Sequence, residues 1–245
     1  MPALSKSILS KIKSLSIKKY RDKFQLFVAE GPTLIADLQL SHLKIDSIYA
    51  TKDWVENNPK APAIELSSKE LTRMSSLKTP NQVLCLVEIP KYEFDPKKLS
   101  ALTLVLDNIS DPGNMGSIIR TADWFGVQNI VCSMNCTDIY NSKVVQASMG
   151  SISRVKVHYT DLVPFVKGCK DAFAIYGLVV GGKSINKEQI AGDTLLIVGN
   201  ESKGISQELS SVISKKIGID SFGGAESLNA AVATAIVCYE FNRVN

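Results

Sequence analysis

The sequence predicts an α/β fold, and three observations carry this prediction. Short apolar runs that are typical of buried strands recur at residues 45–50, 83–89, 102–106, 129–133, 173–179 and 195–198. Segments with apolar residues at helical spacing lie between several of them, as at residues 68–74 and 115–125. The composition, 45% hydrophobic and 21% charged, is that of a globular chain able to bury a core. In the second half of the chain, this alternation predicts a largely parallel sheet covered by helices on both faces.

A charged segment, PKYEFDPKKLS at residues 90–100, separates two such alternating regions. It contains two prolines and breaks the periodicity on either side. We therefore expect a small N-terminal domain, residues 1–95, and a larger second domain, residues 96–245. No apolar run reaches the roughly 18 residues that a membrane helix needs, and charges occupy the place of a signal peptide's apolar core. We expect a cytoplasmic protein that does not contact membranes.

Basic residues are concentrated at the start of the chain. Seven of the 28 lysines and arginines lie within residues 1–23, against one of the 24 acidic residues. A basic arm on a near-neutral body predicts contact with the phosphates of a nucleic acid. The candidate RNA-binding residues are Lys18, Lys19, Arg21 and Lys23. The alternative is a solvated amphipathic helix, and both can hold if one face packs while the other meets RNA.

The five cysteines are odd in number and scattered, and they include no C-x-x-C pair. The only histidines, His42 and His158, are distant from them in sequence. We expect reduced thiols and no metal site.

The stretch LVLDNISDPGNMGSIIRTADWFG, residues 104–126, is the most informative in the chain. It reads as a buried strand, a polar turn around Pro112 and Gly113, and a helix whose first turn Asn114 is suited to cap. Arg120 lies off the apolar face of that helix. A strand, a polar turn and a helix N-terminus with an arginine form a candidate site for an anionic or polar ligand. The alternative is an ordinary strand-to-helix turn with a solvated Arg120.

Two further polar loops follow apolar segments later in the chain. In LLIVGNESKGI, Gly199 and Gly204 have the spacing of a phosphate loop, but Ile205 stands where that loop requires lysine, which excludes a P-loop. No G-x-G-x-x-G follows a predicted strand, so the dinucleotide-binding fingerprint is also absent. The third loop, within residues 217–229, precedes an apolar helix that Ser227 is suited to cap.

These three loops together resemble the motifs of the SpoU (TrmH-like) family, in the SPOUT superfamily of RNA methyltransferases. The resemblance rests on Asn108 to Arg120, on G-N-E-x-x-G at residues 199–204 and on S-L-N at residues 227–229. One departure affects the third loop, where Asp220 and Ser221 replace the family's common Pro and Met. Near the N-terminus, the basic cluster followed by LFVAEG looks like the start of a substrate-binding domain similar to ribosomal L30e and L7Ae.

The resemblance implies a fold, a cofactor and a reaction. The fold would be a C-terminal SPOUT domain with a mostly parallel sheet and a deep trefoil knot, preceded by the small L30e-like α/β domain. The activity would be transfer of a methyl group from S-adenosylmethionine to a ribose 2′-OH of RNA by a homodimer. The implied cofactor-binding residues are Gly199, Asn200, Gly204, Ile219 and Leu228. The implied catalytic residues are Arg120, Asn114, Glu201, Ser227 and Asn229.

Several alternatives remain open at this point. Ribosomal RNA is favoured over transfer RNA as the substrate, because of the L30e-like N-terminal domain. A catalytically silent RNA-binding protein on the same scaffold is a rival, as is an enzyme that methylates a base nitrogen. An oxidoreductase with a nucleotide cofactor is disfavoured by the missing fingerprint.

Overall fold

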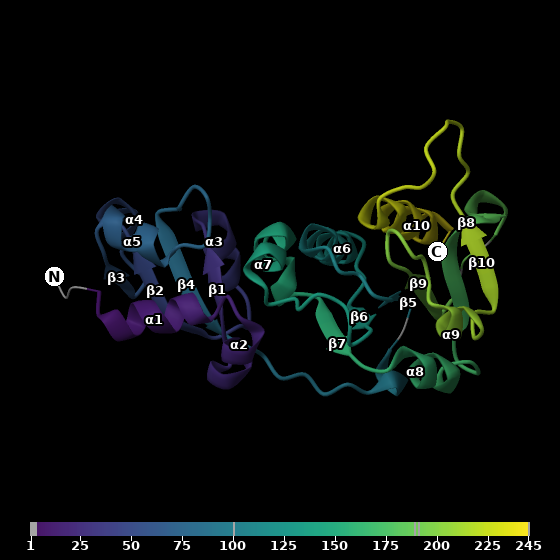
Figure 1. The fold of residues 1–245 in the computed structure, drawn as a ribbon, viewed down its shortest axis with the longest axis horizontal. Helices are drawn as coiled ribbons and strands as arrows, with labels where there is room; N and C mark the ends of the chain where they lie inside the picture. The colour runs from purple at the N-terminus through teal and green to yellow at the C-terminus, as the bar shows by residue number, and fades with distance from the viewer. Residues whose placement is uncertain (1–3, 100, 189, 191, 245) are drawn as a thin grey trace. The chain divides into compact units, whose positions relative to one another are not determined.

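The computed structural model describes residues 4–99, 101–188, 190 and 192–244, and the chain divides into two compact units (Figure 1). Unit 1 comprises residues 1–91 together with residues 138–153. Unit 2 comprises residues 92–137 and 154–245. Within the described residues, no helix is both long enough and apolar enough to cross a membrane.

Unit 1 is built on a four-stranded sheet in the order β1-β4-β2-β3. The strands are β1 (Leu26–Glu30), β2 (Ile45–Ala50), β3 (Ala63–Glu65) and β4 (Val83–Glu88). β4 is antiparallel to both its neighbours, and β2 is parallel to β3. In the part of unit 1 that precedes residue 92, the helices are α1 (Lys6–Ser14), α2 (Lys18–Phe24), α3 (Pro32–Gln39), α4 (Lys52–Asn57) and α5 (Ser68–Met74). The apolar face of α1 is part of the core, since Ile12 and Leu15 are buried against Leu71 and the sheet.

A later segment of the chain completes unit 1. α7 (Ser142–Ser148) packs beside β1, and the short η2 (Ser151–Ser153) follows it. The Tyr140 ring contacts that of Phe27 of β1 in a tilted arrangement, with centroids 4.9 Å apart and an interplanar angle of 31°. The predicted division into consecutive domains, 1–95 and 96–245, therefore differs from the packing at residues 138–153. The reason is that the apolar side of α7 is buried on a sheet formed by the first part of the chain, which local sequence does not reveal.

Unit 2 is built on a six-stranded, all-parallel sheet in the order β10-β8-β9-β5-β6-β7. The strands are β5 (Leu102–Leu106), β6 (Asn129–Cys132), β7 (Lys156–Tyr159), β8 (Ala174–Ser184), β9 (Thr194–Val198) and β10 (Lys215–Gly218). The helical elements are η1 (Pro96–Lys98), α6 (Pro112–Trp124), α8 (Leu162–Gly168), η3 (Ile185–Lys187), α9 (Gln207–Ser210) and α10 (Ala230–Val244). This architecture confirms the predicted fold class, an α/β chain with a parallel sheet in its second half.

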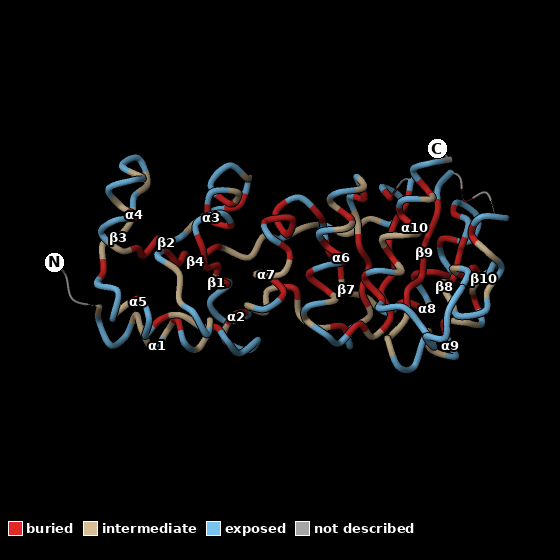
Figure 2. Tube along the Cα trace, turned by 90° about the horizontal axis from the view of Figure 1, so that it is seen from above, coloured by how far each residue is buried: buried red, intermediate tan, exposed pale blue. Residues whose placement is uncertain are grey.

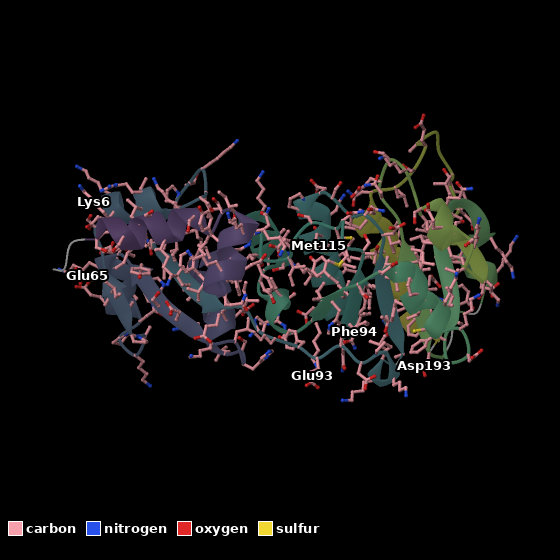
Figure 3. The ribbon with its side chains drawn as sticks, turned by 60° about the horizontal axis from the view of Figure 1, so that its bottom comes forward. Lys6, Glu65, Glu93, Phe94, Met115 and Asp193 are labelled. Atoms are coloured by element: carbon pink, nitrogen blue, oxygen red, sulfur yellow. The ribbon has the colours of Figure 1, made fainter. Side chains whose placement is uncertain are left out.

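Both faces of the parallel sheet are buried. Every residue of β5 and β9 is buried, as expected for central strands covered on two sides, and Figure 2 shows the buried residues along the strands. α6 and α10 pack together on one side of the sheet, and α8 and α9 lie on the other (Figure 1). On the α8 side, Phe94 (labelled in Figure 3) stacks on His158 and contacts Phe165.

Sequence reasoning located the central strands but missed three of the four edge strands. The strand predictions at 45–50 and 102–106 and the helix at 68–74 match β2, β5 and α5. β3, β7 and β10 were not predicted. All three are edge strands of three or four residues that are partly exposed, so they carry no long apolar run. β1 begins only at Leu26, because residues 18–24 form α2, which Gln25 ends with a left-handed φ of 53°.

Candidate functional site

A cavity of about 1000 Å³ opens in unit 2 beside β8 and β9. It is lined by residues 178–180 of β8, residues 198–204, most of residues 219–228, and two alanines at the start of α10. Ligands of open parallel sheets bind outside the carboxyl ends of the strands, and the loops after β9 and β10 are at such ends. The volume suits a ligand of cofactor size. All five predicted cofactor-binding residues, Gly199, Asn200, Gly204, Ile219 and Leu228, line this cavity.

The loop after β9 is a tight turn held by its own backbone. Asn200 and Gly204 exchange both backbone hydrogen bonds, at 3.0 and 2.8 Å. Gly204 has a φ of +68°, which favours glycine. A Cβ at Gly199 would lie 2.3 Å from the carbonyl carbon of Gly204, so no side chain fits there. The close contact between Gly199 and Gly204 therefore keeps this loop tight where it forms part of the cavity wall.

The Asn200 side chain fixes this loop to the loop after β5. Its Oδ1 accepts hydrogen bonds from the backbone N–H groups of Ser202 and Lys203, at 3.0 and 3.1 Å. Its Nδ2 donates to the backbone oxygen of Asn108 at 2.9 Å. Asn108 itself has a left-handed φ of 57°, and its N–H donates to the Ser133 hydroxyl. The first and second sequence motifs thus meet through one amide side chain.

The start of α6 differs from the predicted turn and cap. α6 begins at Pro112, and Asp111 is the N-cap, with its carboxylate accepting from the Asn114 N–H at 2.8 Å. Pro112 suits the first helical position because its φ is fixed near the helical value and the N–H it lacks would have no helical partner. Asn114 is therefore not the cap, and its side chain can bond to other segments.

That side chain joins all three motifs. Asn114 Nδ2 donates to Glu201 Oε1 at 2.5 Å, and Asn114 Oδ1 accepts from Asn229 Nδ2 at 2.8 Å. Asn229 Oδ1 also accepts from the backbone N–H groups of Ala231 and Val232, so Asn229 caps α10. The prediction that Ser227 caps this helix is wrong. The structure brings together Asn114, Glu201 and Asn229 of the predicted catalytic set, and Glu201 and Ser227 both line the cavity.

Arg120 is placed differently from the other predicted catalytic residues. It is exposed on α6 and does not line the cavity of its own chain. Within the described part of the chain, no hydrogen bond or ion pair involves its guanidinium. Trp124, one helical turn later, is 84% exposed. α6 thus presents a cation and a large aromatic ring on one open face.

The charged side chains that line the cavity are mostly acidic. Glu201, Asp220 and Glu226 line it, against one cation, Lys203. Asp220, which stands where the SpoU-like pattern commonly has Pro, accepts a hydrogen bond from the Ser184 hydroxyl at 2.6 Å and so ties the third loop to the end of β8. This set of charges favours a cationic ligand or a ligand with a cationic centre.

Sequence reasoning missed two contributors to the site. Residues 178–180 line the cavity but belong to an apolar strand with no polar motif to mark them. Cys136 holds the loop after β5, since its Sγ donates to the Leu106 oxygen and accepts from the Ile109 N–H, at 3.2 and 3.3 Å. A hydrogen bond from the Cys132 thiol lowers the pKa of Cys136 to about 7, against the opposing effect of burial. Scattered cysteines gave no sequence signal for this role.

Comparison with known proteins identifies the scaffold. Residues 101–239 match the model of the SpoU rRNA Methylase family. The chain belongs to the SpoU family. Residues 6–85 match a second model, the MRM3-like substrate binding domain. The SpoU match spans the strands, the three loops and the cavity of unit 2, and the second match covers most of the sheet of unit 1.

Relatives of this SpoU-family chain match it over nearly its whole length. It is 28% identical over 232 residues to the 23S rRNA (guanosine(2553)-2'-O)-methyltransferase RlmP of Bacillus subtilis, covering 93% of this chain and 92% of that protein. A TrmH-family structure from Porphyromonas gingivalis superposes with a TM-score of 0.88 at 32% identity, covering 99% of both chains. An AdoMet-bound rRNA methyltransferase from Sinorhizobium meliloti gives a TM-score of 0.83 at 27% identity, covering 99% of this chain and 97% of that one.

The predicted RNA-binding residues of unit 1 separate into two groups. Lys18, Lys19 and Lys23 are exposed, and Lys18 pairs with Asp22 at 2.8 Å. Arg21 is only 3% exposed, and its prediction as an RNA contact is corrected. Its guanidinium donates to the Leu15 carbonyl oxygen and twice to the Asp138 carboxylate, with the shorter contact at 2.6 Å. Arg21 faces inward because this ion pair ties α2 to the later segment of unit 1.

Proposed function

We propose that this protein is an S-adenosylmethionine-dependent methyltransferase that acts on a ribose 2′-OH of ribosomal RNA. The observation that carries the proposal is the hydrogen-bonded chain Glu201–Asn114–Asn229, which unites the three motifs and includes one residue that lines the cavity, Glu201. The support for ribosomal RNA over transfer RNA comes from relatives such as RlmP, whose name specifies 23S rRNA and a 2′-O position.

The cavity fits the cofactor by shape and by charge. Gly199 packs directly against the backbone of Gly204, so the loop after β9 forms a wall of backbone along which an adenine ring would lie. Gly199, Ile219 and Leu228 would hold the adenine end, with Asn200 and Gly204 shaping the loop around it. Glu201, Asp220 and Glu226 supply negative charge near a cationic centre. When bound, S-adenosylmethionine supplies a methyl group on a sulfonium, which is a good leaving group.

The protein's own residues must then orient the hydroxyl and assist the loss of its proton. Arginine stays protonated in proteins, so we assign Arg120 to hold the phosphate next to the target ribose and stabilise the developing alkoxide. Asn114 positions Glu201 and Asn229, and Ser227 and Asn229 would contact the nucleotide. These roles rest on the positions of the side chains in the three motifs.

We further propose a homodimer in which Arg120 reaches the cavity of the partner chain. Arg120 is absent from the lining of its own cavity, and the exposed Trp124, Val232 and Tyr239 give α6 and α10 an apolar surface that a second copy would cover. We also propose that the loops of unit 2 form the deep trefoil knot typical of the family. Unit 1 would bind the RNA. A ribosomal RNA substrate would place the enzyme in the cytoplasm.

The test is transfer of labelled methyl from S-adenosylmethionine to unmodified ribosomal RNA, with bulk transfer RNA in parallel. We expect 2′-O-methylnucleoside from ribosomal RNA, and a fall in kcat of roughly 100-fold for Arg120→Ala. Arg120→Lys should recover only part of the rate, because lysine lacks the fork that holds phosphate. The cofactor affinity of both variants, measured by calorimetry, should stay within about twofold of wild type.

Other results would assign the chain to a different class. Label recovered in a base would show that the enzyme methylates a base and not the ribose. Label in transfer RNA alone would change the substrate. Cofactor binding without transfer to either RNA would favour the catalytically silent RNA-binding alternative, and failure to bind the cofactor would overturn the proposal.

A further inference from the structure

The exposed side of α2 carries two stacked aromatic rings among lysines. Tyr20 and Phe24 lie one helical turn apart, with ring centroids 6.5 Å apart and an interplanar angle of 18°. Phe24 is 36% exposed, which is unusual for a phenylalanine so close to a packed sheet. The ammonium groups of Lys11, from α1, and Lys23, from α2, each lie 5.5 Å from the centroid of the Phe24 ring.

The two helices that carry these side chains, α1 and α2, are anchored to the core of unit 1. α1 is anchored through buried Ile12 and Leu15, and α2 through the buried Arg21, whose guanidinium bonds the Leu15 oxygen. Because both helices are fixed to the body of unit 1, the rings and the lysine backbones need no ordering when a ligand arrives. A preordered surface of this kind binds with a smaller entropic cost than a flexible arm.

The charges around the rings are not neutralised by the protein. Lys11 and Lys23 approach one ring from two helices, and no ion pair among the described residues involves either ammonium. Two like charges near one exposed ring repel each other, and the attraction of an exposed ring for a cation is only about 0.5–1 kcal/mol. An anion bound beside the ring would relieve this repulsion. A phosphate is the anion that fits next to an aromatic ring open for stacking.

We propose that Tyr20, Phe24, Lys11 and Lys23 form a stacking platform that binds an unpaired stretch of the RNA substrate. A splayed-out base would stack on the exposed part of the Phe24 ring, and the flexible lysine side chains would move to the flanking phosphates. Bases in a duplex are already stacked on each other, so the platform selects loops, bulges or single strands. The inference rests on the proposed RNA methyltransferase function and adds the class of RNA structure that unit 1 recognises.

The test uses the full chain and a fluorescein-labelled ten-nucleotide oligouridine. The comparison is a fully paired RNA hairpin of equal charge, whose two strands are joined by a non-nucleotide linker so that no base is unpaired. Phe24→Tyr keeps the ring, and Phe24→Leu keeps the apolar volume without the ring. We expect Phe24→Tyr to bind oligouridine like wild type and Phe24→Leu to bind it about 5-fold more weakly, within the range of base stacking. Binding to the hairpin should change by less than about twofold in both variants.

The lysines are tested by the salt dependence of oligouridine binding. Replacing both lysines, Lys11→Gln with Lys23→Gln, should make the slope of log affinity against log salt concentration less negative by roughly 1.4, since each phosphate contact on a single strand contributes about −0.7. Lys52→Gln with Lys60→Gln, which removes two exposed lysines elsewhere in unit 1, is the matched control and should leave the slope nearly unchanged. Melting temperatures of all variants verify that the fold is intact.

Two results would overturn the platform. One is equal oligouridine affinity for wild type, Phe24→Leu and Phe24→Tyr, and the other is an equal loss on oligouridine and hairpin. Oligouridine binding needs neither the cofactor nor methyl transfer, so the two proposals can fail separately. If the protein transfers methyl groups and Phe24→Leu leaves the affinity for oligouridine unchanged, only the platform proposal fails. If the affinity for oligouridine depends on the aromatic ring at position 24 but the protein transfers no methyl group, only the proposed activity fails.

Discussion

Reversing the hydrogen bond between Asn114 and Glu201 tests whether the amide chain shapes the cofactor cavity. In the wild type, the Asn114 amide donates to the Glu201 carboxylate at 2.5 Å. Asn114→Asp replaces the donor by a second carboxylate. Asn114→Asp with Glu201→Gln restores the bond with donor and acceptor exchanged, and the other oxygen of the new carboxylate can still accept from Asn229.

The magnitude follows from the charges at that distance. A hydrogen bond to a charged group contributes about 1.5–3 kcal/mol. Two carboxylates about 4 Å apart repel by about 4 kcal/mol at an effective dielectric constant of about 20, and partial solvent exposure of both groups reduces this. We expect Asn114→Asp to cost about 3 kcal/mol. If the loop must return to its wild-type position before ligand binds, this loss lowers cofactor affinity roughly 100-fold.

Calorimetric titration of S-adenosylmethionine measures this effect. Glu201→Gln alone keeps an oxygen that accepts from Asn114 and should weaken binding by no more than about tenfold. The double variant should bind within about tenfold of wild type. Asn57→Asp, which adds the same charge at an exposed position in α4, is the control and should bind normally. The reasoning is refuted if the double variant binds no better than Asn114→Asp alone.

Three further predictions concern other parts of the molecule. Gly199→Ala should reduce cofactor affinity at least about tenfold, as a calorimetric titration would measure, because its Cβ must displace the backbone of Gly204 inside the cavity wall. Hydrogen bonds from two lysines lower the pKa of Glu188 from 4.5 to about 2, so its stabilising effect should be complete above pH 4.5 and vanish as the pH falls towards 2. Arg21→Met should lower the free energy of unfolding by about 2–4 kcal/mol, because it leaves the carboxylate of Asp138 without its buried partner.

Each of these predictions has a contradicting outcome. Normal cofactor titration of Gly199→Ala would mean that the close approach at that loop is not needed for binding. For Glu188→Gln, melting is compared with wild type between about pH 7 and pH 3, and a difference that grows on acidification would reverse the expected sign. Unchanged urea unfolding of Arg21→Met would show that the ion pair does not hold α2.

The central strands and the three polar loops could be predicted from the sequence because their signals are local. β5 and β9 are continuous apolar runs, since both of their faces are buried. The loop at residues 199–204 is marked by glycines, one for close approach and one for a positive φ. These features depend on the residues themselves and their immediate neighbours, so their order along the chain was enough to indicate the family.

Partners that are distant in sequence were decided only by the tertiary structure. Asn114 could have been a helix cap, and Asp111 takes that place because Pro112 occupies the first helical position. In the sequence, Arg21 resembles its neighbouring lysines. In the fold it is buried and pairs with the carboxylate of Asp138, 117 residues further along the chain. Local sequence determines which conformations a segment prefers. The partner that neutralises a charge, and the residues to which an amide side chain hydrogen-bonds, depend on packing between segments that are far apart in the chain.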